Sequence, residues 1–143
     1  MKFFEFHFRP KDKNRVKTQS FCYEPKASAE KKLGSLCMAG ELINILPPNK
    51  NLMEDLAQIM KNAYYSQTEN TEEAIERAFS AANAFLANES KKGNVGWLGN
   101  LNFATLSFAE DNLYFGKIGN IKIIMARKGE LLNVAGDLEG QHV

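Results

Sequence analysis

Histidine and cysteine are scarce in this chain, which has two of each among its 143 residues. A hydrolytic triad needs a histidine held rigidly beside the nucleophile, whereas His7 lies in an alternating segment and His142 is the penultimate residue. A structural zinc site needs four close ligands, and Cys22 and Cys37 stand apart from both histidines. We therefore expect no catalytic residues, no cofactor, and thiols that are reduced and packed.

An excess of charge of either sign is also missing. The chain has 18 basic and 17 acidic residues, which gives a net charge of +1. That balance provides no long-range field for capturing nucleic acid, and we expect no nucleic-acid partner. The basic run from Arg9 to Lys17 is interpreted as a solvated hairpin loop, with a local basic patch as the alternative.

Long hydrophobic runs are absent as well. Glu5, His7 and Arg9 interrupt the N-terminal phenylalanines, so no signal-peptide core is present. No stretch approaches the roughly 20 apolar residues of a membrane-spanning helix. We expect a cytoplasmic protein without a membrane segment, and the length is typical of one domain covering residues 1–143.

Three strands are predicted before the first helix. Phe4, Phe6 and Phe8 alternate with polar residues, as in a half-buried strand. Residues 16–23 form a second strand that ends at Glu24-Pro25. Residues 33–45 form a third, mostly apolar strand with a bend near Gly40.

Two helices are predicted in the middle of the chain. The first follows Asn51, which is expected to cap it together with Glu54 in the third helical position, and runs to about residue 65. The second begins near Thr71 and ends before Gly93. Residues 93–99 carry three glycines around Trp97 but precede a strand, so the segment is interpreted as an irregular connection anchored by the indole and not as a phosphate-binding loop.

The last third is predicted to be a β-meander. Its strands are residues 101–109, 113–118, 121–126 and 131–134, and Gly119-Asn120 is expected to form a two-residue hairpin turn. Short turns force neighbouring strands to be antiparallel. The expected fold class is therefore α+β in the order βββ-αα-ββββ, with largely antiparallel sheets and both helices packed on one face.

The expected core lies between the helices and the sheet. Its helical members share apolar positions at helical spacing. They are Leu56, Ile59 and Met60 on the first helix and Phe79, Ala82 and Phe85 on the second. In the strand 101–109, Ala104, Leu106 and Phe108 form an uninterrupted apolar face and are expected to be the more deeply buried side.

Glu41 is the one acidic residue whose position is unusual. The other carboxylates concentrate at helix starts and turns, where capping and solvation explain them, whereas Glu41 lies inside the most apolar strand. Glu41 is either a structural residue or a weak candidate for a metal ligand, and no metal site is predicted from the residues alone.

The order of elements resembles the N-terminal part of the metal-dependent (PPM-type) serine/threonine phosphatases. The similarity is carried by LYFGKIGNIKIIMARKGE at residues 113–130, which resembles that family's V-G-D-S-R and R-x-G turns, and by AFSAANAFL at residues 78–86. The resemblance implies a sandwich of two sheets with helices outside, and two divalent metals held by aspartates.

The aspartates that the family uses are missing here. The early strand at residues 18–23 has no carboxylate, and the family's D-G-x-G-G turn is best matched by residues 37–41, where Gly40 remains and only Glu41 is acidic. The G-D-S-R turn reads Gly119-Asn120-Ile121-Lys122. Two hard cations need several carboxylates, so the resemblance implies a degenerate, non-catalytic member.

Three functions follow as hypotheses. The first is a pseudophosphatase domain with a binding or regulatory role. The second is a divergent metal-dependent phosphatase that uses Glu41 and residues from a partner chain, and the third is an unrelated α+β protein-interaction module. Because the resembled fold uses more chain than this, we expect either a homodimer or the N-terminal portion of a longer protein, with a protein as the partner.

Overall fold

The computed structural model describes residues 2, 4, 6, 15–67 and 70–136. These residues form an α+β fold, as the order of predicted elements indicated. The elements are β1 (Val16–Tyr23), the 3-10 turn η1 (Glu30–Leu33), β2 (Ser35–Ile43), the 3-10 turn η2 (Pro47–Asn49), α1 (Leu52–Tyr64), α2 (Thr71–Lys91), β3 (Leu101–Ala109), β4 (Asn112–Ile118), β5 (Ile124–Arg127) and β6 (Glu130–Asn133).

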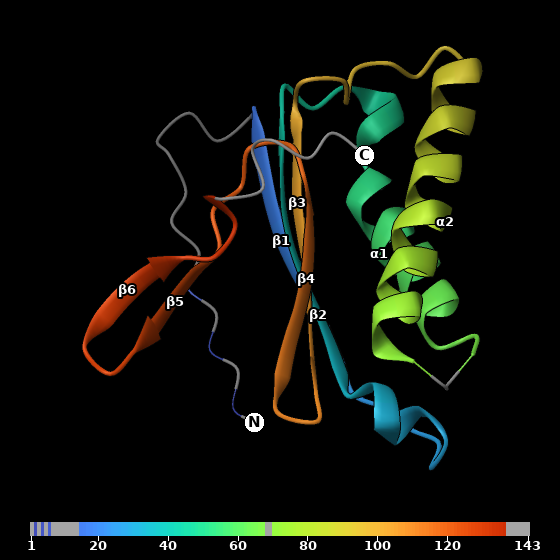
Figure 1. Ribbon diagram of the computed structural model, residues 1–143. Helices are drawn as coiled ribbons and strands as arrows, with labels where there is room; N and C mark the ends of the chain where they lie inside the picture. Colours follow the sequence, from blue (N-terminus) through green and yellow to red (C-terminus); the bar gives the residue numbers. More distant parts are fainter. Residues whose placement is uncertain (1, 3, 5, 7–14, 68–69, 137–143) are drawn as a thin grey trace.

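Four of the strands form one antiparallel sheet in the order β1-β2-β3-β4. The helical pair α1–α2 connects the two central strands and covers one face of the sheet (Figure 1). The β5–β6 hairpin is a separate two-stranded sheet on the opposite side. The expectation that both helices pack on one face is confirmed.

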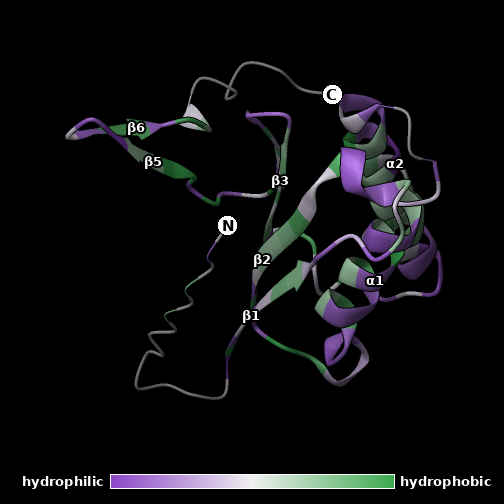
Figure 2. Cartoon of the chain, turned by 90° about the horizontal axis from the view of Figure 1, so that it is seen from below, coloured by the Kyte–Doolittle hydropathy of each residue, from purple (hydrophilic) through white to green (hydrophobic). Residues whose placement is uncertain are grey.

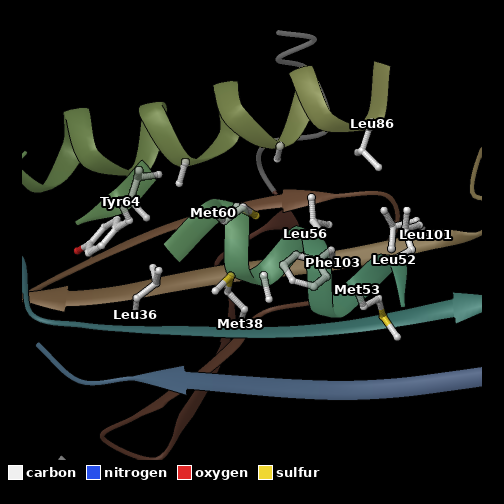
Figure 3. Packing of buried hydrophobic residues seen from close by; sticks show 14 of the residues in the cluster. Leu36, Met38, Leu52, Met53, Leu56, Met60, Tyr64, Leu86, Leu101 and Phe103 are labelled. Atoms are coloured by element: carbon white, nitrogen blue, oxygen red, sulfur yellow. The ribbon is translucent and has the colours of Figure 1, made fainter. Parts of the chain in front are cut away.

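The main core lies between this face and the helices. Leu56 and Met60 of α1 are fully buried against Phe103 of β3, and Figure 3 shows these side chains pointing toward one another. On α2, Ala78 and Ala82 are fully buried, whereas Phe79 and Phe85 are only partly buried at the edge of the cluster. Small residues one turn apart let the two helices approach closely. The helical part of the predicted core is therefore confirmed for Leu56, Met60 and Ala82 but not for Ile59, which is only half-buried.

The start of α2 is fixed by the side chain of Asn70, which caps the helix. Asn70 lies in an extended conformation, and its Oδ1 accepts hydrogen bonds from the backbone N–H groups of Glu72 at 2.9 Å and Glu73 at 3.4 Å. Such a side chain satisfies donors that the helix itself leaves without a partner. The helix ends before Gly93, whose φ of +86° favours glycine.

The predicted cap of α1 is wrong. The Asn51 side chain makes no capping hydrogen bond. Glu54 instead accepts hydrogen bonds from Lys17 Nζ at 2.6 Å and Gln19 Nε2 at 2.8 Å, both on β1. A tertiary contact to the edge strand has replaced the local one, and Glu54 ties α1 to β1.

The predicted buried face of β3 is also wrong. Phe103, Thr105 and Ser107 face the helices and are fully buried, whereas Phe108 on the other face is 36% exposed. The two buried hydroxyls have acceptors or donors within the core, which removes the penalty of burying them. Ser107 Oγ lies 3.0 Å from the Leu33 carbonyl oxygen and 2.5 Å from the Tyr64 hydroxyl oxygen, and its single proton is shared between these two acceptors.

Tyr64 is the residue that makes the polar side of β3 fit the core. Its hydroxyl also donates to the Leu33 carbonyl at 2.5 Å, which links α1, η1 and β3 at one point. Burial raises the pKa of Tyr64, partly offset by the Ser107 hydroxyl, so the phenol keeps its proton as a donor.

The opposite face of β3 is covered by a smaller apolar cluster. Ala104 is buried there against Ile123 and Ala135, which belong to the segment after β4. Leu106 and Phe115 pack at the rim of this cluster. β3 is thus covered on both faces, as expected for a sandwiched strand, but Leu106 and Phe108 are not the deeply buried side.

The predicted four-stranded meander is only partly confirmed. β3 and β4 pair through a turn in which Glu110 and Asp111 both have positive φ. Gly119-Asn120 does not form a hairpin turn, because the Asn120 N–H is bound by the Asn102 side chain at 2.7 Å instead. The chain then leaves the sheet, and β5 pairs with β6 across the predicted turn at residues 127–130.

The predicted N-terminal strand falls largely outside the described residues, as does most of the basic run before Lys17. Phe4 and Phe6 are described, and their side chains are 78% and 80% exposed. Within the described part of the chain, neither helix is long and apolar enough to cross a membrane.

Two phenylalanines on β3 provide a direct test of its orientation. Phe103→Ala should lower the free energy of unfolding by about 3–5 kcal/mol, because the ring is fully buried. Phe108→Ala should cost about 1 kcal/mol or less, because its ring is partly in water. Urea unfolding measures both, and equal losses would show that the orientation is wrong.

Glu54 should make part of the stability dependent on pH. Burial by itself would raise the pKa of Glu54, but the hydrogen bonds from Lys17 and Gln19 outweigh it and hold the pKa below its usual value. A depressed pKa gives stability above the ordinary pKa that is lost as the pH falls through the folded value. Because the side chain is 38% exposed, the effect should be below about 1 kcal/mol.

The measurement is the urea midpoint at about pH 7 and about pH 3.5. Glu54→Gln should reduce the difference between these midpoints, and Lys17→Met should reduce it in the same direction because it removes the partner. A Glu54→Gln variant that loses as much stability on acidification as the parent would contradict the assignment.

Candidate functional site

A row of polar side chains crosses three strands on the sheet face that the helices do not cover. Glu41 of β2 lies directly opposite Thr18 of β1 and Asn102 of β3 in the strand register. Directly opposed residues point to the same face of a sheet. All three side chains are half-buried.

Asn102 is the centre of this row. Its Nδ2 donates to Glu41 Oε1 at 3.2 Å, and its Oδ1 accepts from the backbone N–H of Asn120 at 2.7 Å. Both ends of the amide are therefore used, which fixes its orientation. Asn102 joins β2 to the turn that follows β4.

The positions singled out in the sequence are thus brought together. Glu41 lies between Thr18 of the early strand and Asn102, and Asn102 in turn binds the Gly119-Asn120 turn. Sequence reasoning missed Asn102 itself. The signal that could have identified it is an amide in an otherwise apolar segment, LNFATLSFA at residues 101–109.

Gly40 is explained by packing on the helical face. A Cβ at this position would lie 2.4 Å from the Phe103 ring and 3.0 Å from Met53 Sδ. Glycine is therefore required so that the ring can lie across β2. The requirement arises from the core and not from a ligand on the face where Glu41 lies.

The polar row offers few groups that could bind a metal ion. Glu41 supplies a single carboxylate, and the oxygen that faces Asn102 already accepts a hydrogen bond. Among the residues that the structure describes, no group of three or more His, Cys, Asp or Glu side chains could hold a metal ion. A pair of hard cations needs several carboxylates, and this row does not offer them.

A hollow of about 910 Å³ opens at the end of β1, beside the β1–β2 connection. Lys61 Nζ lies 4.8 Å from the centre of the Tyr23 ring, which forms one wall. Tyr65 forms another wall and donates from its hydroxyl to the Gly34 carbonyl at 2.9 Å. Burial raises the pKa of Tyr65, so this phenol is a hydrogen-bond donor and not a base.

The other residues singled out in the sequence are the two histidines and Trp97. His7 and His142 lie outside the described residues. Trp97 is partly buried against the main core, as expected for an anchor. The segment around it is held by Asn100 Nδ2, which donates to the Gly96 carbonyl at 2.9 Å.

No family model, curated protein or solved structure matches this chain.

The geometry of the row can be tested by adding a second carboxylate to it. Asn102→Asp keeps an acceptor for the Asn120 N–H but places a negative charge opposite Glu41, and like charges in such a pair destabilise a sheet. We expect a loss of about 1 kcal/mol in the free energy of unfolding.

The control is a double-mutant cycle. Glu41→Gln keeps an oxygen for the Asn102 amide and should have little effect alone, while combining it with Asn102→Asp should recover most of the loss. Urea unfolding of the four proteins measures the coupling. Additive effects of the two substitutions would mean that the side chains do not meet.

Proposed function

We propose that this chain is a non-catalytic, phosphatase-like domain whose role is to bind a protein partner or a second copy of itself. The observation that carries the proposal is the Glu41–Asn102–Asn120 row. In the stretches where the resemblance implies several acidic metal ligands, Glu41 is the one carboxylate of the row, and Asn102 hydrogen-bonds both to it and to the Asn120 N–H. Side chains that already hydrogen-bond to one another stabilise the sheet and are not available to bind a metal or a substrate.

The order of the elements supports the phosphatase-like half of the proposal. The resemblance implies three strands, two helices and a meander, and the described elements follow this order in part, with two strands, two helices, two further strands and a separate hairpin, while the helices cover one face. The opposite face of β3 is covered by apolar residues after β4. This arrangement is compatible with a two-layered fold, although many functions share such folds.

Exposed apolar side chains support the binding half. Ile124 is 61% exposed, and Leu131 and Leu132 are 75% and 43% exposed. Figure 2 shows hydrophobic residues along β5 and β6, which stand clear of the four-stranded sheet. In the hairpin register Ile124 and Leu131 lie on the same face, and exposed apolar side chains grouped in this way are typical of contacts with another protein.

Calorimetry and a phosphatase assay distinguish this proposal from a divergent enzyme. Titration with manganese or magnesium should give no saturable heat, and a generic aryl phosphate should not be hydrolysed above the blank. The physical reason is the single carboxylate of the row.

Micromolar metal binding together with turnover would overturn the proposal. Glu41→Gln is the matched control for that outcome, because it removes the one charge of the row. If turnover disappears in this variant, the activity belongs to the row and the chain is a divergent phosphatase.

A further inference from the structure

The two cysteines lie on the same sheet face as Glu41, in the neighbouring part of β1 and β2. Cys22 and Cys37 are directly opposite each other in the strand register, and their Sγ atoms are 2.8 Å apart. Neither is in a disulfide, and the expectation of packed thiols holds for Cys37 but is wrong for Cys22, which is exposed. Because the two cysteines are 15 residues apart in the sequence, the sequence alone did not indicate that their thiols are close.

The hydrogen bonds between β1 and β2 show whether Cys22 and Cys37 are a hydrogen-bonded or a non-hydrogen-bonded pair of the ladder. The Asn44 N–H donates to the Arg15 carbonyl at 2.6 Å, which makes these two residues a hydrogen-bonded pair at the end of the ladder. Such pairs alternate with non-hydrogen-bonded pairs along antiparallel strands. The register runs without interruption from Val16↔Ile43 to Tyr23↔Leu36. Counting along it places Cys22 and Cys37 in a non-hydrogen-bonded pair.

This kind of pair suits a covalent bridge. Its Cα atoms are typically about 4.5 Å apart, and disulfides span Cα separations of about 4.4–6.8 Å. The backbone therefore needs no large movement for the two sulfurs to bond.

The two thiols differ in access to solvent. Cys22 is exposed on the edge strand β1 and lines the hollow of about 910 Å³, beside Tyr23 and Lys26. Cys37 is only 9% exposed, because it lies on a central strand opposite Leu106 of β3. A small reagent can reach the first sulfur more readily than the second.

We propose that Cys22 and Cys37 form a redox-responsive dithiol that low-molecular-weight disulfides oxidise to a cross-strand disulfide. The Cys22 thiolate attacks one sulfur of the small disulfide, whose S–S bond breaks and releases one thiol. The Cys37 thiolate then attacks the Cys22 sulfur and releases the second thiol. Two protein thiols are oxidised, the small disulfide is reduced to two thiols, and the two protons end on those products.

The bridge would act on the edge of the sheet. Among the strands that the structure describes, β1 pairs with β2 alone, so a covalent bond between them fastens this strand to the centre of the sheet. The bond also closes the connection at residues 24–34, which forms a wall of the hollow, into a covalent ring. Pairs of this kind in reducing compartments are usually transient and redox-sensing.

The experiment exposes the folded chain to glutathione disulfide under native conditions. Intact mass, thiol titration after denaturation and peptide mapping follow the products. The parent should lose both thiols, become lighter by two hydrogen atoms, and give one peptide that joins Cys22 to Cys37. Reduction with dithiothreitol should restore the original mass.

Two serine variants test the order of the steps. Cys37→Ser should stop at the mixed disulfide with one glutathione on Cys22, and Cys22→Ser should remain largely unmodified because the Cys37 sulfur is buried. A parent that keeps glutathione attached, that forms only disulfide-linked dimers, or that retains both thiols would overturn the proposal. The parent's peptide map decides the linkage even if a serine variant fails to fold.

Discussion

The hydrogen bonds that join Tyr64, Ser107 and the Leu33 carbonyl decide how the central strand β3 is oriented. A strand can present either of two faces to the helices, and a buried hydroxyl is costly unless it has a partner. Here the partner comes from α1, and a carbonyl from η1 completes the group. With these groups satisfied, Phe103 and Thr105 can face the helices together with Ser107, and the main core forms around them.

The orientation of β3 also decides which of its side chains lie on the sheet face away from the helices. Because successive side chains alternate, placing Phe103 toward the helices places Asn102 and Ala104 on the other side. Asn102 there meets Glu41 and captures the Asn120 N–H, and the chain leaves the sheet at that point. The segment that follows then covers Ala104. The orientation of β3 thus places the polar row on the face away from the helices, where Asn102 can bind the Asn120 N–H.

The sheet face away from the helices carries both the polar row and the pair of thiols. The polar row lies in the middle of β1, β2 and β3, and the thiol pair lies four residues along β1 from Thr18, near the end of the strand pair. Within the row, Asn102 hydrogen-bonds to Glu41 and to the Asn120 N–H, which is the observation behind the proposed non-catalytic role. The thiol pair combines one exposed and one buried sulfur, which is the asymmetry that stepwise thiol–disulfide exchange requires.

Among the described residues, the sequence by itself determined both helices and most of the strands. Periodicity and turn residues placed β1, β3 and both helices within a residue or so, because these are local properties of the chain. It did not determine the face of β3, the partner of Glu54 or the path after Gly119. Each of those depends on a residue distant in sequence, namely Tyr64, Lys17 and Asn102 respectively. Glu41 could be singled out locally, but only the strand register decided that its neighbours are amides and hydroxyls, and that two isolated cysteines lie opposite each other.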